Sequence, residues 1–170
     1  MLTYQQARRI AESEIQDWRS PNDPDDRLVI VGSDIIEKPY AWIFPYTSQK
    51  WLLTGDIRYA IAGNAPLFID KLDGRISTFR TGLSREGMID EYEEQNKIWR
   101  LTVTTPIQHD TPKQLHLKSI LNLSLEELAA LKAQTHPIIT RGSRHRLERL
   151  ATKLKTNGID TNIELAIKIP

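Results

Sequence analysis

The stretch Leu67-Phe68-Ile69-Asp70-Lys71-Leu72-Asp73-Gly74 contains the clearest signal for the fold. An apolar run leads into an Asp-Gly pair, and a second short run begins at Ile76. Because glycine tolerates a positive φ, an Asp-Gly pair between two such runs is typical of a β-hairpin. The segment therefore predicts two neighbouring antiparallel strands, at residues 67–70 and 76–80.

Two further strands and two helices are predicted around this hairpin. The sequence Thr3-Tyr4-Gln5-Gln6 has the form of a capping box and precedes an apolar stripe with helical spacing that ends at Trp18. Prolines and Asp residues at 20–26 predict a turn. Strands are expected at residues 28–36 and 40–46, and an acidic helix at residues 88–94. The first half thus has the order α-β-β-β-β-α, in which helices cover one face of an antiparallel sheet.

The pattern changes at Trp99, where residues 99–104 alternate with a period of two. The elements that follow are predicted from caps and apolar periodicity: helices at residues 113–121, 125–133 and 144–156, and strands at residues 137–140 and 163–169. This half has the order β-α-α-β-α-β. We therefore expect an α+β protein of two small domains, residues 1–95 and 97–170.

The composition indicates a folded globular protein, since 39% of the 170 residues are hydrophobic and 26% are charged. No apolar run reaches the ~18 residues of a membrane span, and the first residues lack the basic-then-apolar order of a signal peptide. We expect a cytoplasmic protein with no membrane partner. The absence of cysteine excludes disulfides, thiolate metal sites and cysteine nucleophiles.

The formal net charge of +1 conceals an uneven distribution. Residues 1–95 carry 11 Lys and Arg against 16 Asp and Glu, whereas residues 96–170 carry 12 against 6. An acidic half therefore precedes a basic half. This arrangement fits two modules that face different partners, two modules held together by opposite fields, or a difference without function.

No catalytic, cofactor or metal-binding motif occurs in the chain. The four histidines lack the helical i, i+4 spacing of a metallohydrolase, which favours surface or polar packing for them. Asp23, Asp25 and Asp26 lack the glycine and the distant glutamate of a calcium loop. A nucleophile elbow, a Walker loop and a dinucleotide fingerprint are also missing. We expect a protein that is not an enzyme and that holds no cofactor and no metal.

Several short motifs follow one another in the first half. They are Leu53-Thr54-Gly55-Asp56, Ile61-Ala62-Gly63-Asn64-Ala65-Pro66, Phe68-Ile69-Asp70-Lys71 and Asp73-Gly74, with Ser84 and Tyr92 downstream. With these motifs, nearly all of residues 1–95 resembles the immunity protein 35 (YrhB-like) family of polymorphic toxin systems. The resemblance implies a protein that neutralises a cognate toxin by binding it, and it leaves the toxin and the oligomeric state unspecified.

The second half is similar in element order to the C-terminal domain of the bacterial ribosomal stalk protein. The similarity spans about residues 97–169 and rests on Leu121-Asn122-Leu123-Ser124-Leu125-Glu126-Glu127-Leu128, Pro137-Ile138-Ile139, Gly142, Leu147, Leu150, Leu154, Gly158 and Glu164-Leu165. A related adaptor fold, which delivers substrates to an ATP-dependent protease, is an equally close analogy. The alternative function is therefore a chaperone or adaptor that recruits a partner through this domain.

Two charged surfaces are the candidate interaction sites. An acidic surface would complement the basic cleft of a toxin that acts on nucleic acid, and a tryptophan beside a charged loop is either a core residue or an apolar anchor. The predicted toxin-binding residues are Asp90, Glu91, Glu93, Glu94, Asp23, Asp25, Asp26 and Trp51.

A basic stretch is the second candidate surface. It could follow a phosphate backbone, dock on a protein or be a solvated helix face. Because no aromatic residue interleaves the basic ones for base stacking, nucleic acid is a poor candidate partner. The residues of this second interaction surface are Arg141, Arg144, Arg146 and Arg149.

Overall fold

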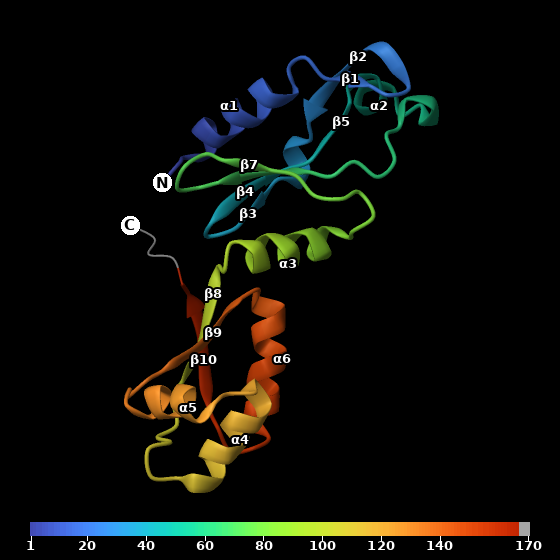
Figure 1. The fold of residues 1–170 in the computed structure, drawn as a ribbon. Coiled ribbons are helices and arrows are strands. Elements are labelled where there is room, and N and C mark those ends of the chain that lie inside the picture. Colours follow the sequence, from blue (N-terminus) through green and yellow to red (C-terminus); the bar gives the residue numbers. More distant parts are fainter. Residues whose placement is uncertain (167–170) are drawn as a thin grey trace. The chain divides into compact units, whose positions relative to one another are not determined.

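A computed structural model describes residues 1–166 of the chain. These residues form two compact units, of which the first comprises residues 1–84 and the second begins at Arg85 (Figure 1). Both units combine helices with antiparallel sheets, so the predicted α+β class is confirmed. This division lies before α3, whereas the sequence predicts domains of residues 1–95 and 97–170. Separate folding of two domains remains a prediction.

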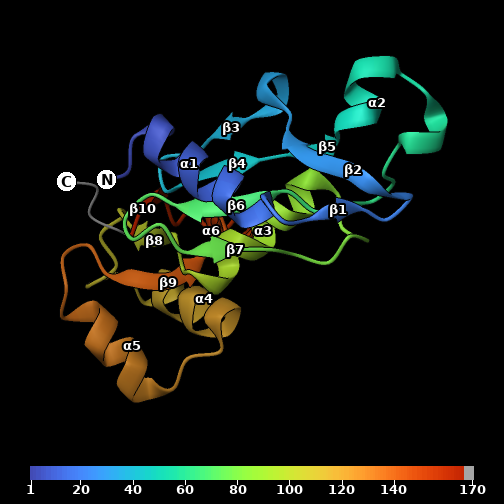
Figure 2. The ribbon, with the colours of Figure 1, turned by 90° about the horizontal axis from the view of Figure 1, so that it is seen from above.

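The first unit is built from two helices, two single-turn 3-10 helices and short strands. These elements are α1 (Tyr4–Ile15), β1 (Arg19–Ser20), β2 (Asp23–Ile30), η1 (Gly32–Asp34), β3 (Ile36–Glu37), β4 (Ala41–Phe44), β5 (Tyr46–Ser48), α2 (Gln49–Thr54), η2 (Ile57–Tyr59), β6 (Leu67–Asp70) and β7 (Ile76–Ser77). The strands form one sheet in the order β1-β2-β5 and another in the order β3-β4-β6-β7 (Figure 2). Every strand pair is antiparallel.

Helix α1 supplies the core of this unit. It begins with the predicted capping box, in which the Thr3 hydroxyl accepts the Gln6 N–H at 3.3 Å and the Gln6 side chain accepts the Thr3 N–H at 2.9 Å. The buried residues of α1 pack against β4 and β6, which brings together Ala7, Ala11, Ile15, Phe44, Leu67 and Ile69. The helix therefore covers one face of the four-stranded sheet (Figures 1 and 2).

The predicted hairpin is present. Ile69 of β6 faces Ile76 of β7, and Gly74 in the turn has a φ of +76°. The Asp73 carboxylate accepts the Arg75 N–H at 2.9 Å, and the Asp70 carboxylate accepts the Leu72 N–H at 2.7 Å. The Asp-Lys and Asp-Gly motifs thus build the turn, because their side chains and their glycine satisfy its backbone geometry.

The turn predicted within residues 20–26 is confined to Pro21 and Asn22, because β1 ends at Ser20 and β2 begins at Asp23. Ser20 faces Asp23 and Arg19 faces Arg27, so the longer β2 segment bulges against β1. Pro24 lies within this bulge, where its missing N–H costs no ladder hydrogen bond.

The strands predicted at 28–36 and 40–46 are also divided in the structure. The first ends at Ile30 before η1, and the second is interrupted at Pro45, which cannot donate a backbone hydrogen bond. As a result, β4 and β5 belong to different sheets. The sequence pattern placed the apolar segments correctly and missed the break between the two sheets.

The second unit begins with α3 and continues in the predicted order β-α-α-β-α-β. Its elements are α3 (Arg85–Gln95), β8 (Trp99–Val103), α4 (Thr111–Leu121), α5 (Leu125–Lys132), β9 (Ile138–Gly142), α6 (Arg144–Lys155) and β10 (Thr161–Leu165). Strand β8 lies between β10 and β9 in an antiparallel sheet. The predicted last strand runs to residue 169, and residues 167–169 lie outside the described residues.

The core of the second unit lies between this sheet and the helices α4, α5 and α6. Leu101 and Val103 of β8 are fully buried with Leu117, Leu147 and Leu154. Helix α5 begins with a capping box, since Ser124 and Glu127 exchange hydrogen bonds. Among residues 1–166, no helix is both long and apolar enough to cross a membrane.

The place of α3 leads to a first prediction. A fragment of residues 85–170 keeps α3, whereas a fragment of residues 97–170 removes its contacts with α6. We expect the longer fragment to melt at a higher temperature, by roughly 4–8 °C for each kcal/mol that α3 contributes to a domain of this size. Thermal unfolding followed by circular dichroism measures this difference. Equal melting temperatures would show that α3 does not stabilise the second unit.

Candidate interaction surfaces

Two carboxylates at the end of α3 lie at the N-terminus of α6. Glu93 Oε2 accepts the N–H of Arg144 at 2.8 Å, and Glu94 Oε2 accepts the N–H of Ser143 at 2.8 Å. The Ser143 hydroxyl in turn accepts the N–H of Arg146 at 3.3 Å. An α-helix leaves its first N–H groups without partners, and its dipole favours negative charge at this end. The acidic helix therefore caps the basic one.

Glu94 is also paired with two cations. Its Oε2 atom lies 2.9 Å from Arg146 Nε, and its Oε1 atom lies 2.5 Å from Lys97 Nζ. Burial acts to raise the pKa of Glu94, but the hydrogen bonds from Lys97, Ser143 and Arg146 together lower this pKa to about 2. The carboxylate is therefore ionised at neutral pH, and its charge is compensated inside the unit.

Gly142 makes this approach possible. A Cβ atom at this position would lie 2.2 Å from both Glu94 Oε2 and Arg146 Nη2. Any larger residue would push apart the ion pair that covers the start of α6. Gly142 precedes the N-cap residue Ser143, and its lack of a side chain leaves room for the carboxylate.

The predicted acidic surface and the predicted basic surface contact each other in the second unit. Glu93 is 5% exposed and Glu94 pairs with Arg146, while Asp90 Oδ1 lies 4.0 Å from His145 Nδ1. Arg144 pairs with Glu148 at 2.8 Å and lies over the Trp99 ring. In the second unit, Glu91, Arg141 and Arg149 are among the predicted residues that form no ion pair with residues 1–166.

The charge difference between the two halves of the sequence largely disappears when the chain is divided at the boundary of the two structural units. Residues 1–84 carry 10 Lys and Arg against 11 Asp and Glu, a net charge of −1, and residues 85–170 carry 13 against 11, a net charge of +2. Division of the chain after residue 95 separates α3 from α6, the helix that it caps. The opposite charges therefore neutralise each other inside the second unit.

A different surface stands out in the first unit, where α2 is attached through a buried carboxylate. Asp26 is 1% exposed and accepts hydrogen bonds from the Ser48 hydroxyl and, at 3.0 Å, from the Lys50 N–H. The Ser48 hydroxyl accepts the Trp51 N–H at 2.9 Å, which caps α2. Strand β2 thus holds the first turn of α2 in place.

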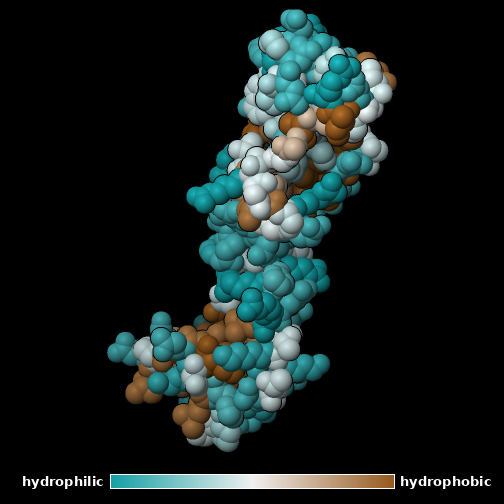
Figure 3. All heavy atoms as spheres, turned by 90° about the vertical axis from the view of Figure 1, so that its right-hand side faces the viewer, coloured by the Kyte–Doolittle hydropathy of each residue, from teal (hydrophilic) through white to brown (hydrophobic). Residues whose placement is uncertain are grey.

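Helix α2 carries exposed apolar side chains outward. Leu52 is 54% exposed and Leu53 is 77% exposed, and Ile57 of the following η2 is 76% exposed. We call these three residues the apolar projection. Figure 3 views the molecule from the side on which α2 lies in Figure 1, and hydrophobic side chains are exposed there on the first unit. Adjacent exposed apolar residues of this size are typical of a protein interaction surface.

The motif Leu53-Thr54-Gly55-Asp56 shapes this projection. Gly55 ends α2 in a left-handed conformation, with its N–H donating to the Trp51 carbonyl at 2.8 Å. Asp56 then accepts the N–H of Arg58 at 3.0 Å and so begins η2. The motif therefore places the exposed Leu53 and Ile57 on either side of a fixed corner.

The remaining predicted residues lie next to this projection. Trp51 is half-buried on α2, and Asp23 pairs with Lys50 Nζ at 2.6 Å. Asp25 is exposed. Asp26 is buried with both oxygens engaged, so it positions α2 instead of offering a surface carboxylate. The structure thus brings together Asp23, Asp26 and Trp51, and places Asp90, Glu91, Glu93 and Glu94 in the other unit.

Sequence reasoning missed the apolar projection itself. Residues 51–53 look like one more apolar segment, and their burial depends on how a six-residue helix is attached. Two signals were available: Ser48 three residues before Trp51, as in an N-cap, and a glycine directly after the apolar run. All four histidines, His109, His116, His136 and His145, are exposed, which agrees with the prediction of surface or polar packing. Within residues 1–166, no three His, Asp or Glu side chains lie together as metal ligands.

These features define an α+β protein with an anchored apolar surface suited to contact with another protein. The sequence model of immunity protein 35 matches residues 5–110, and the chain belongs to this family. It is also 38% identical over 52 residues to the uncharacterized protein YrhB of Escherichia coli (strain K12), an alignment that covers 31% of this chain.

The alignment spans 55% of the length of YrhB, so the chain matches about half of that relative. No solved structure matches the chain significantly. The likeness of the second half to the ribosomal stalk domain therefore gains no support beyond the element order. The family match also runs through α3 and β8 to residue 110, so it does not end where the first unit ends.

Glu94 gives a second prediction, on stability against pH. Because its folded pKa lies below the ordinary value of 4.5, the ionised side chain stabilises the fold above that value, and this contribution is lost as the pH falls towards 2. With its side chain 36% exposed, solvent screening limits the effect to roughly 1 kcal/mol. We expect Glu94→Gln to lower stability at pH 7 and to differ little from wild type near pH 2.

Urea unfolding across this pH range measures the effect. Glu91→Gln is the matched control on the same helix, since the Glu91 carboxylate accepts only from the Gln95 side chain, at 3.0 Å, in the described structure. If the two variants showed the same pH profile, the contact of Glu94 with α6 would not stabilise the protein.

Proposed function

We propose that the protein binds a cognate bacterial toxin directly and neutralises it without catalysis of its own. Membership of the immunity protein 35 family supports a toxin partner in general. The proposal includes a toxin from a polymorphic or secreted toxin system and a complex that forms in the cytoplasm. We place the surface that contacts the toxin on the first unit.

The observation that carries this proposal is the apolar projection. Each of Leu52, Leu53 and Ile57 leaves much of its side chain in water, and covering a side chain of this size contributes ~1.5–3 kcal/mol. Since Asp26 and Ser48 already fix α2, little ordering of the backbone remains to oppose binding. Large apolar side chains on a fixed backbone are suited to the buried centre of a protein interface.

The charges around the projection indicate the kind of surface that would meet it. Lys50 pairs with Asp23 at 2.6 Å, and Arg58 pairs with Asp56 at 2.6 Å, so the rim is charged but internally neutral. The partner's contact surface therefore needs an apolar cleft at its centre to hold the apolar projection. Polar groups around that cleft would meet a rim whose charges are already paired, with Asp25 as an additional exposed carboxylate.

The acidic helix α3 enters the proposal with fewer residues than the sequence suggested. Glu93 and Glu94 are engaged by α6, so reversing their charge would damage the fold before it tested binding. Asp90 is half-buried beside His145. Glu91 therefore remains as the side chain on α3 through which long-range attraction of a basic toxin can be tested.

The adaptor alternative has one observation in its favour. On the second unit, Leu115 of α4 is 59% exposed and Leu125 of α5 is 74% exposed. A chaperone or adaptor of this kind would suppress aggregation of unrelated proteins without a specific partner. Immunity instead requires rescue from one specific toxin.

The third prediction concerns this contact. If the protein encoded next to this gene is the cognate toxin, its co-expression with this chain should restore growth and yield a stable complex. Leu53→Ala and Ile57→Ala should each weaken that complex by about tenfold or more, because truncated central residues cost over ~1.4 kcal/mol. Binding by isothermal titration calorimetry gives the change, and thermal unfolding shows whether the variants remain folded.

Leu125→Ala is the matched control, since it removes an equally exposed leucine from the second unit. The control should leave affinity within about twofold. A toxin complex that tolerates both substitutions in the first unit would move the contact elsewhere. Absence of any complex or rescue would contradict the immunity function.

A fourth prediction separates steering from anchoring. Glu91→Lys should slow association with a basic toxin and flatten its dependence on salt, whereas Ile57→Ala should mainly speed dissociation. Stopped-flow kinetics over a salt series measures both rates. Glu126→Lys, on an exposed residue of α5, is the control for charge alone. An unchanged salt slope for Glu91→Lys would show that Glu91 is a solvated side chain without a role in attracting the toxin.

A further inference from the structure

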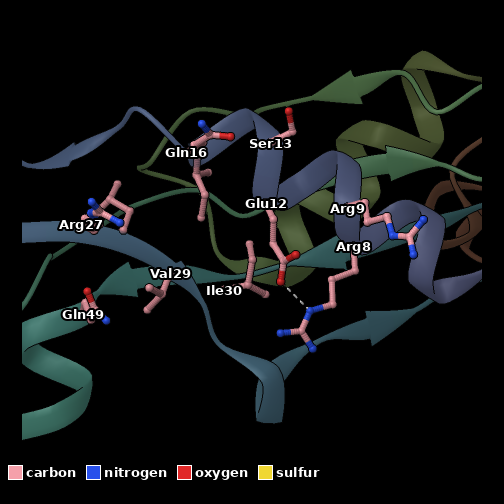
Figure 4. A pocket seen from close by; sticks show the side chains of 11 residues that line it. Arg8, Arg9, Glu12, Ser13, Gln16, Arg27, Val29, Ile30 and Gln49 are labelled. Carbon is pink, nitrogen blue, oxygen red and sulfur yellow. Dashed lines mark hydrogen bonds and ion pairs between the residues drawn. The ribbon is translucent and has the colours of Figure 1, made fainter.

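A groove runs between α1 and β2, entirely within the first unit (Figure 4). Its volume is about 610 Å³, which is in the range of sites that hold a ligand or a short peptide segment. The lining side chains come from both elements and from the start of α2. Those used below are Arg8, Arg9, Glu12, Ile15, Arg27 and Ile30.

The groove is positively charged at both ends. Figure 4 shows Arg27 at one end and Arg8 with Arg9 at the other. Arg8 is paired with Glu12 at 2.8 Å and also donates to the Tyr4 hydroxyl at 3.2 Å. In the described part of the chain, Arg9 and Arg27 have no hydrogen-bond or ion-pair partner for their guanidinium groups. Two planar, fork-shaped donors therefore remain available for carboxylates.

The floor of the groove is aliphatic. Ile15 is 3% exposed and Ile30 is 9% exposed, and the half-buried Val29 lies between the two arginine ends in Figure 4. The amide side chains of Gln16 and Gln49 also border the groove. A ligand that fits these walls carries acidic groups and apolar groups within one chain.

The edge of β2 favours an extended chain. Leu28, Val29 and Ile30 pair with β5 on one side, and β1 pairs with β2 only at Asp23 and Arg27. Within residues 1–166, no strand pairs with the other side of residues 28–30. An extended segment along this side would be held by backbone hydrogen bonds, as in recognition by strand addition.

We propose that this groove binds an extended acidic segment of a partner protein, with its carboxylates on Arg9 and Arg27 and its apolar side chains on the floor. Nucleic acid fits less well, because no aromatic side chain lines the groove for base stacking and the carboxylate of Glu12 lies within it. This contact is separate from the apolar projection. It goes beyond the proposed function, because it holds for any partner that carries such a segment.

Fluorescence anisotropy with the full chain tests the proposal. The probe is a fluorescein-labelled peptide of about nine residues that alternates Glu and Val, a length that matches a strand of ordinary size. A peptide alternating Lys and Val and a ten-nucleotide oligothymidine are the comparison ligands. We expect the acidic peptide to bind and the basic peptide to show no binding.

The decisive variant is the double substitution Arg9→Gln with Arg27→Gln, which should weaken peptide binding about tenfold. Its control is Arg80→Gln with Arg149→Gln, which removes the same charge from exposed positions outside the groove and should weaken binding less than about twofold. Since Arg9 and Arg27 have no partners to lose, the melting temperature of the groove variant should be unchanged.

Three results would overturn the proposal. The first is no binding of the acidic peptide at about millimolar protein, the weak end of measurable affinity. The second is equal weakening by both double variants, which would indicate bulk charge alone. The third is tighter binding of oligothymidine with the same dependence on Arg9 and Arg27. None of these results depends on the toxin, so failure here is distinct from failure of the immunity function.

Discussion

The buried carboxylate of Asp26 is the interaction on which the surface of the first unit depends. A lone carboxylate inside a protein is costly, and this one is stabilised because a hydroxyl and a backbone N–H point at it. Those two donors belong to Ser48 and Lys50, which lie at the junction of β5 and α2. A short helix with little intrinsic stability is thus fixed to the sheet through its first turn.

The second unit solves a similar problem with the opposite geometry. There the helix end supplies the donors, and two successive glutamates of α3 supply the acceptors. Since α6 carries most of the basic residues near this end, the same carboxylates also balance their charge. Acidic and basic runs that look like separate binding surfaces in the sequence are, in space, two sides of one internal contact.

Much of the fold could be predicted from the sequence, because local signals determine it. The hairpin at Asp73-Gly74, the caps at Thr3 and Ser124, and the order of elements after Trp99 follow from short-range chemistry. The exchange between sheets at Pro45 could not be predicted, since it depends on which strands pair across the chain. Pro45 indicates that the strand is interrupted, but it does not indicate that the two parts join different sheets.

The candidate site was predicted less well, for a related reason. Trp51 is half-buried and Asp23 is paired with Lys50, while Asp26 and Glu93 are buried. An acidic side chain in a sequence favours exposure, and only the arrival of donors from distant segments reverses this. Apolar side chains favour burial, but Leu53 and Ile57 are exposed because no segment of residues 1–84 covers them.

The anchoring of α2 separates the residues that hold the helix from those that it presents. Asp26, Ser48 and Gly55 keep the corner in place, and none of them needs the side chains of Leu52, Leu53 or Ile57 to do so. Mutation can therefore alter the presented side chains at small cost to stability. Homologous proteins can therefore change their binding specificity at these exposed positions while they retain the same fold. This would allow the protein to adapt as the sequence of its partner changes.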